Sequence, residues 1–163
     1  MTDMTSLSQT SDSPTSDLVA RTAALLGGDR VLRHHLETSL DAHEMLVTGL
    51  PGEALLHLLE SFEILRRRAP LELATGISLR TIQRRRGAPV QLLSREQSGR
   101  TWKLAEVLAK ATAVLGSREA AEQWLECPAV GLDQRRPIDL LSTPAGMTLV
   151  EEFLERLEYG VYT

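Results

Sequence analysis

The sequence predicts an all-α protein, and three observations support that fold class. Apolar residues recur at spacings of three and four along most of the chain, as they do on the buried face of a helix. Residues that cap helix N-termini precede several of these stretches. No segment combines alternating polarity with enrichment in β-branched or aromatic residues, so strands are not expected.

The N-terminal third is expected to hold a mobile tail and three helices. Residues 1–16 contain nine Ser or Thr and few large apolar groups, which predicts disorder because such a segment cannot offset the entropy of ordering. Helical periodicity begins at Asp17 and stops before a Gly-Gly pair, and a second run covers about 29–47. After a break rich in glycine and proline, a third helix is expected over about 53–67.

A long helix is expected over 94–115, where Ser94 and Gln97 form a capping box at its start. It is apolar around most of its circumference. It is therefore either the central helix of the core or the seam of a homodimer, with Trp102–Leu115 as the leading candidate for the seam.

Two more helices are expected after it. Ser117 is placed to cap a helix over about 118–126, and Pro144 to open the last helix at its first position. The apolar face of the last helix consists of Met147, Val150, Phe153, Leu154 and Leu157.

The composition is that of a folded globular protein with an ordinary apolar core. The 163 residues are 42% hydrophobic and 25% charged, and no apolar run approaches the roughly 20 residues of a membrane helix. The start of the sequence lacks the basic and apolar regions of a signal peptide, so we expect a cytoplasmic protein with no membrane partner. Cys127 is the single cysteine, which leaves neither an internal disulfide nor a structural zinc site to stabilise the fold.

Positive charge is concentrated in one segment of an otherwise acidic chain. Residues 66–100 contain nine arginines against two glutamates, a net charge of +7, while nine basic and twenty acidic groups give the rest −11 and the whole chain −4. Such a segment is typical of a surface that binds an anion, most often nucleic acid. A solvated arginine-rich face without a partner is the alternative.

The same segment contains the pattern of a helix-turn-helix, APLELATGISLRTIQRRRG. Pro70 is expected to begin a short helix, Gly76 to supply the turn and Ser78 to cap the second helix. Ile77 and Ile82 have the spacing of a hydrophobic staple at this cap. An ordinary helical hairpin with a polar outer face has the same local pattern.

With Leu79 and Ile82 turned inward, the remaining side chains of the second helix are suited to base edges and phosphates. The DNA-binding residues predicted in this way are Ser78, Arg80, Thr81, Gln83, Arg84, Arg85 and Arg86. The preceding run Arg66–Arg68 is expected to contact phosphates.

Residues 117–163 are acidic and are predicted to form a second functional surface. Both tyrosines, Tyr159 and Tyr162, fall in the last five residues on either side of Gly160, and large amphipathic aromatic residues often anchor interfaces. The alternative is that this end folds back onto the protein's own core.

Four stretches also carry a resemblance to a known family. They are ATGISLRTIQRRRG, SREQSGRTWKLAEVLAKA, AAEQWLECPAVGLDQRRPIDLLSTPAG and LERLEYGVY. The combination of QRRPIDLL with EYGVY is more specific to a family than any helix-turn-helix signal. Over about 17–163 the chain resembles the Xre/MbcA/ParS antitoxins of bacterial type II toxin–antitoxin systems, particularly those paired with RES-domain toxins.

The resemblance implies an antitoxin with two functional domains. Residues 17–93 would form a DNA-binding domain for the operon's own promoter, and residues 94–163 a dimerisation and toxin-binding domain. This domain would block a RES toxin, an enzyme that consumes NAD, within a complex containing an antitoxin homodimer. The toxin-binding residues implied are Val150, Leu154, Leu157, Glu158, Tyr159, Gly160, Val161, Tyr162 and Thr163. Glu155, Glu158 and a terminal carboxylate are placed to enter a pocket shaped for an anionic dinucleotide.

No catalytic site, metal or cofactor is expected. The four histidines His34, His35, His43 and His57 form no metal-binding motif, and no phosphate-binding loop is present. The adjacent carboxylates Glu151, Glu152 and Glu155 are more typical of a solvated helix face than of acid–base catalysis. An enzyme is therefore not expected, and the alternative function is a stand-alone helix-turn-helix regulator whose C-terminal domain only dimerises or senses a ligand.

Overall fold

The computed structural model describes residues 14–86 and 91–160, apart from the side chains of Arg68, Ala69 and Arg85. Within this part of the chain every extended regular element is a helix, and β-type pairing is confined to two isolated bridges. The predicted all-α fold class is confirmed. The elements are α1 Pro14–Leu25, α2 Gly28–Leu32, α3 Ser39–Thr48, α4 Gly52–Ser61, η1 Glu63–Arg66, α5 Arg68–Thr75, α6 Leu79–Arg85, α7 Arg95–Leu115, α8 Arg118–Glu126, η2 Val130–Leu132, α9 Pro137–Leu140 and α10 Pro144–Glu158.

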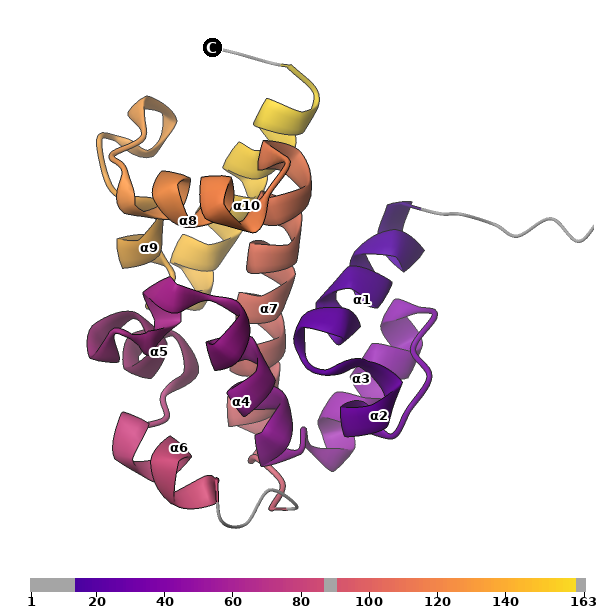
Figure 1. Ribbon diagram of the computed structural model, residues 1–163. Helices are drawn as coiled ribbons and strands as arrows, with labels where there is room; N and C mark the ends of the chain where they lie inside the picture. The colour runs from indigo at the N-terminus through magenta and orange to yellow at the C-terminus, as the bar shows by residue number, and fades with distance from the viewer. Residues whose placement is uncertain (1–13, 87–90, 161–163) are drawn as a thin grey trace, which may run out of the picture.

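The long helix α7 is the centre of the molecule. The helices α1, α3, α5, α8 and α10 all pack against it, and Figure 1 shows α1–α3 on one side of it and α4–α6 with α8–α10 on the other. Leu104, Val107 and Leu108 of α7 are fully buried. The prediction of a central core helix is confirmed. The prediction of a homodimer seam along Trp102–Leu115 is wrong, because the protein's own helices already cover this surface.

The first two predicted helices differ from the observed ones at their ends. Residues 14–16 are helical rather than part of the tail, because proline suits the first turn of a helix, where its missing N–H is not needed. The run 29–47 is divided into α2 and α3. Arg33 has a left-handed backbone with φ of 57°, and Thr38 and Asp41 form a capping box that starts a new helix.

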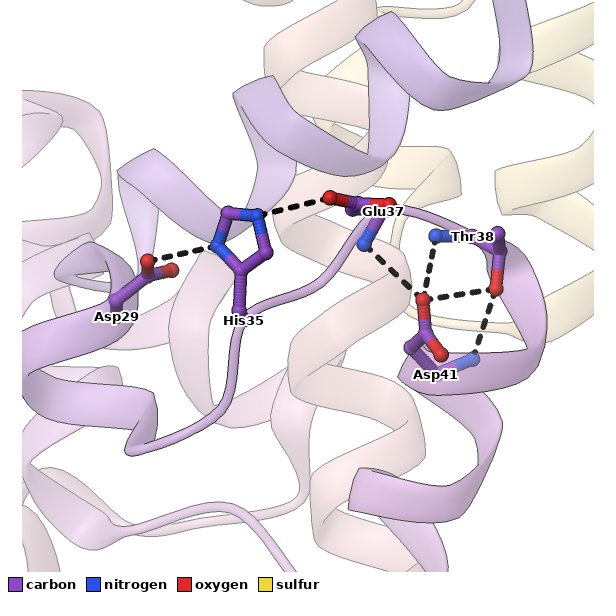
Figure 2. A network of polar contacts seen from close by, with 5 residues as sticks. All are labelled: Asp29, His35, Glu37, Thr38 and Asp41. Atoms are coloured by element: carbon purple, nitrogen blue, oxygen red, sulfur yellow. Dashed lines mark hydrogen bonds and ion pairs between the residues drawn. The ribbon is translucent and has the colours of Figure 1, made fainter.

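A network of polar contacts joins α2 to α3 across this connection (Figure 2). His35 lies between two carboxylates, with Nδ1 2.8 Å from Asp29 Oδ2 and Nε2 3.1 Å from Glu37 Oε1. The hydrogen bond and negative charge of Asp29, assisted by Glu37, raise the pKa of His35. Hydrogen bonds from the side chain and backbone of Thr38 and from the Glu37 N–H lower the pKa of Asp41. The connection is therefore held by contacts that depend on protonation.

The helix α4 ends at Ser61, six residues before the end expected near residue 67. Phe62 is extended, with φ of −128° and ψ of 119°, and its ring is fully buried. The short turn η1 follows and leads into α5, which begins at Arg68, two residues before the predicted start at Pro70. The apolar spacing predicted a continuous helix because a helix and a following turn share the same buried side.

Of the helices from α7 onward, α7, α8 and α10 begin where the sequence predicted, whereas the short helix α9 was not predicted. Ser94 and Gln97 form the capping box of α7, Ser117 caps α8, and Thr143 caps α10 immediately before Pro144. Within residues 14–86 and 91–160, no helix has both the length and the hydropathy needed to span a membrane.

Candidate functional site

The helices α5 and α6 have the local structure predicted for the helix-turn-helix. Gly76 ends α5 in the left-handed backbone region, with φ of 70°, which glycine adopts without strain. Ser78 caps α6 by accepting a hydrogen bond from the Thr81 N–H at 3.2 Å. Ile77 and Ile82 are both buried, as a hydrophobic staple requires.

Two polar side chains of α5 also fix the turn, and sequence reasoning missed both. Glu72 Oε1 accepts a hydrogen bond from the Leu79 N–H at 2.7 Å. The Thr75 hydroxyl donates to the Leu71 carbonyl at 2.8 Å and accepts from the Ile77 N–H at 3.2 Å. These bonds satisfy backbone groups that helix ends leave unpaired. The only signal in the sequence is a carboxylate seven residues before the second helix, which charge counting does not distinguish.

The predicted DNA-binding side chains of α6 point mostly to solvent. Arg80, Gln83, Arg84 and Arg86 are exposed and Thr81 is half-buried, while the side chain of Arg85 lies outside the described part. Among the described side chains, Arg80, Arg84 and Arg86 have no ion-pair partner. Their positive charge is available to an external anion.

Two other arginines of the basic segment are engaged within the protein. Arg67 pairs with Glu126 of α8, and Arg100 lies 3.0 Å from Glu96 one turn earlier on α7. Arg67 thus has a carboxylate partner within the chain, and the contact of Arg66–Arg68 with phosphates stays a prediction.

The inner face of α10 is part of the core. Val150 and Leu154 are fully buried, as is Met147, while Leu157 is half-buried against the same core. The prediction that Val150 and Leu154 contact a toxin is wrong, because side chains enclosed by the protein's own core cannot reach a partner without local unfolding. The apolar periodicity correctly identified a buried face but assigned it to the wrong interface.

Ion pairs between α10 and α7 occupy two of the glutamates considered above. Lys103 Nζ lies 2.7 Å from Glu151 Oε1, and Lys110 Nζ lies 2.6 Å from Glu155 Oε1. The expectation that Glu155 enters a partner's pocket is corrected, since this carboxylate helps to hold α10 on α7. Glu158 is exposed and lies outside these pairs.

The outer side of α10 carries apolar groups that the core does not use. Leu149 is 49% exposed and Tyr159 is 76% exposed. Val130, in the loop before α9, is 80% exposed. In the described part of residues 110–160 these three are the exposed large hydrophobic residues. Sequence reasoning missed Val130 and Leu149. Val130 lies in the stretch PAVGLD, which has no helical periodicity, and Leu149 lies outside the periodic apolar face of the last helix.

Phe153 connects the Val130 loop to α10. A Cβ added to Gly131 would overlap the Phe153 ring, so the loop backbone packs directly on this ring. The Arg156 guanidinium lies 5.5 Å from the centre of the same ring, within the range of a cation–π contact. We define the C-terminal surface as Val130, Leu149, Phe153, Arg156 and Tyr159. Of the remaining predicted residues, Gly160 is exposed, whereas Val161, Tyr162 and Thr163 lie outside the described residues.

Known proteins match both the C-terminal region and most of the chain. Residues 110–160 match the family model described as the antitoxin Xre/MbcA/ParS C-terminal toxin-binding domain. The chain is 30% identical over 127 residues to Antitoxin Xre of Pseudomonas putida, and this aligned region covers 77% of this chain and 76% of that protein. It is 34% identical over 91 residues to Antitoxin Xre of Yersinia enterocolitica, and this aligned region covers 55% of this chain and 61% of that protein.

The similarity, the all-α fold and the match over the C-terminal helices define the class: the protein is an antitoxin of a toxin–antitoxin system. More particularly, the chain belongs to the Xre/MbcA/ParS antitoxin family.

Proposed function

We propose that this antitoxin neutralises a RES-domain toxin, an enzyme that consumes NAD, by placing its C-terminal region in the toxin's active site, and that it binds its own promoter through α5 and α6. The observation that carries the toxin-binding part is the C-terminal surface. Its exposed large apolar side chains, Val130, Leu149 and Tyr159, all lie within the segment that matches the toxin-binding family model. Exposed apolar groups with a polar surrounding are typical of protein–protein interfaces.

The position of α10 supports neutralisation by occlusion. Figure 1 shows the C-terminal end of α10 at one extremity of the molecule, away from α1–α6. Tyr159 is exposed at this end, next to Glu158 and Gly160, so the residues proposed to enter the toxin are presented without moving the core. The proposed toxin-binding set is accordingly the C-terminal surface together with Leu157 and Glu158–Thr163.

The test of this part uses the toxin encoded beside the gene. We expect purified toxin to consume NAD and to stop when the antitoxin is added in equal amount, with a stable complex on gel filtration. A complex in which NAD consumption continues would contradict occlusion of the active site.

The exposed arginines Arg80 and Arg84 of α6, which have no ion-pair partner among the described side chains, support promoter binding. Arg80 and Arg84 have the side chain that most often forms paired hydrogen bonds with guanine in the major groove, and Ser78 anchors the start of the helix that carries them. Binding of a duplex from the sequence upstream of the gene should exceed that of a shuffled duplex and should weaken steeply with salt. Equal affinity for both duplexes would contradict specific promoter recognition.

A homodimer is proposed because one helix-turn-helix contacts few base pairs and a two-fold operator needs two copies. Since α7 is covered, the interface must use other surface. Within the described residues, the exposed large hydrophobic residues outside the C-terminal surface are Leu40, Val47, Leu73 and Leu92. Light scattering that gives the mass of a monomer at micromolar concentration would contradict the dimer.

The domain limits 17–93 and 94–163 are likewise a proposal. The helix α7 of the second domain packs on α1 of the first domain as well as on α10.

A further inference from the structure

One face of α8 contacts the connection that leads into the helix-turn-helix. Its three polar residues Arg118, Glu122 and Glu126 are spaced by four and therefore lie on the same side of the helix. The segment that they contact is Phe62–Arg67, which joins α4 to α5 and includes η1.

Each of the three residues makes a different contact with this connection. Glu122 Oε1 accepts a hydrogen bond from the Ile64 N–H at 3.1 Å. Glu126 pairs with Arg67, the residue immediately before α5. The Arg118 guanidinium lies 5.5 Å from the centre of the buried Phe62 ring. Together they hold the beginning, middle and end of the connection.

The hydrogen bond from Ile64 is the contact that fixes backbone position. Ile64 is the second residue of η1 and its side chain is buried. Among the described backbone bonds in this turn, Leu65 N–H donates to the Phe62 carbonyl, whereas Ile64 N–H has Glu122 as its acceptor. A partly buried N–H without an acceptor is costly, so Glu122 holds η1 against α8.

The opposite side of α8 contacts the C-terminal surface. Trp124 of α8 stacks on Phe153, with ring centres 6.0 Å apart and ring planes 5° from parallel. Phe153 is the ring on which the Val130 loop packs. A single helix of nine residues therefore touches both the proposed toxin-binding surface and the connection to α5.

We infer that Arg118, Glu122 and Glu126 are positioning residues for DNA binding, which hold α5 and α6 in place through the connection Phe62–Arg67. The inference rests on the proposed promoter binding for its functional meaning, while the contacts themselves do not depend on it.

The first test measures local order without DNA or toxin. In Glu122→Ala, amide hydrogen exchange in α5 and α6 should accelerate about tenfold relative to the native protein, because η1 loses its anchor. Glu122→Gln should restore slow exchange, since its amide oxygen accepts the same hydrogen bond. Glu119→Ala is the matched control, because Glu119 is exposed on the same helix. Equal exchange in Glu122→Ala and Glu119→Ala would overturn the inference.

The second test measures function with a labelled duplex from the sequence upstream of the gene. We expect Glu122→Ala to weaken binding about tenfold, and Glu122→Gln and Glu119→Ala to bind like the native protein. Faster exchange with unchanged DNA affinity would overturn the positioning role. If the native protein itself fails to bind DNA, the proposed promoter binding fails, and hydrogen exchange still decides separately whether α8 holds α5 and α6.

Discussion

The helices α6 and α10 are both amphipathic, yet their polar and apolar sides are used in opposite ways. On α6 the residues predicted to bind a partner came from the polar side, and Arg80 and Arg84 are exposed and unpaired among the described residues. On α10 the predicted residues came mainly from the apolar side, and Val150 and Leu154 are enclosed by the core. The difference teaches that apolar periodicity identifies the face that the chain itself covers.

The two helices also differ in how firmly they are held. A cavity of about 470 Å³ lies between α4 and α6 and is lined on the α6 side by Leu79, Ile82, Gln83 and Arg86. The inner face of α10 has fully buried side chains, and two lysines of α7 pair with its glutamates. Regions with sparse packing open locally at lower free energy. The helix α6 is therefore the more easily displaced of the two, and α10 belongs to the structural core.

The largest expected effect separates the two faces of α10. Leu154→Ala should lower the free energy of unfolding by about 2–5 kcal/mol, because it leaves a cavity in the core. Leu149→Ala, on the outer side of the same helix, should change it by less than about 0.5 kcal/mol. Denaturant unfolding of the two variants measures the difference. Similar losses for both would show that the division of α10 into core and partner faces is incorrect.

The next effect concerns the partner face itself. Tyr159→Ala should weaken binding of the toxin by about 2 kcal/mol or more, as truncation of an aromatic anchor commonly does, without changing the unfolding midpoint. Deletion of Glu158–Thr163 should abolish inhibition of NAD consumption while DNA binding persists, because α5 and α6 lie far from this end in Figure 1. Full inhibition by the truncated protein would mean that another surface neutralises the toxin.

Local signals in the sequence were sufficient for much of the fold. The caps Ser78, Ser94 and Ser117 predicted three helix starts, because a capping hydrogen bond involves residues only two or three apart. Pro144 predicted a fourth start, since proline suits the first turn of a helix. The break between α2 and α3 was missed because the apolar period continues across it. The contacts of Glu72 with Leu79 and of Glu122 with Ile64 depend on chain reversal and tertiary packing, which no local pattern contains.

The same reasoning explains what could be predicted of the candidate sites. Exposed arginines of α6 were predictable, since charge is rarely buried without a partner. Val130 was not, because its exposure depends on the fold of the loop 127–136. In that loop Asp133 and Gln134 both have positive φ and Ala129 pairs with Arg135, which places Val130 outward.

The third prediction tests whether the outer side of α6 recognises bases. Arg80→Ala or Arg84→Ala should weaken binding of the promoter duplex by about 1–3 kcal/mol and weaken binding of a shuffled duplex less, because paired contacts with a base are lost. Arg66→Ala should weaken both duplexes alike, since a phosphate contact carries no sequence information. Equal losses on both duplexes for all three variants would remove α6 from the role of recognition helix.

A smaller effect is expected where the two regions meet. Glu126→Gln removes the charge that neutralises Arg67 but keeps an amide oxygen that accepts the hydrogen bond from its guanidinium. The connection to α5 therefore stays in place, while the positive charge of Arg67 becomes available to a phosphate. Binding of a shuffled duplex should tighten by a few-fold and its dependence on salt should steepen by about one counterion. Glu119→Gln removes the same charge from α8 at a position without an arginine partner among the described contacts, and separates the specific pair from the general change in net charge. Identical changes in the two variants would exclude a specific role for the pair.

The smallest expected effect concerns the connection between α2 and α3. It should leave the functions of α6 and α10 unchanged, and it therefore serves as a control for their comparison. His35 has a raised pKa because Asp29 and Glu37 flank it, so its protonated form stabilises the connection between α2 and α3. The contribution is complete below the ordinary value of 6.5 and is lost as the pH rises through the raised pKa. Asp41, whose pKa is lowered, stabilises the fold at pH values above its ordinary pKa of 3.8 and loses that stabilisation only at lower pH.

In His35→Gln, the decline in unfolding midpoint from below pH 6.5 to above the raised pKa of His35 should be shallower than in the native protein. Promoter binding and toxin inhibition by this variant should match the native protein at each pH, because the network lies in neither α6 nor α10. A loss of either function in His35→Gln would show that the lobe α1–α3 takes part in binding and that the comparison between α6 and α10 omits a third functional region.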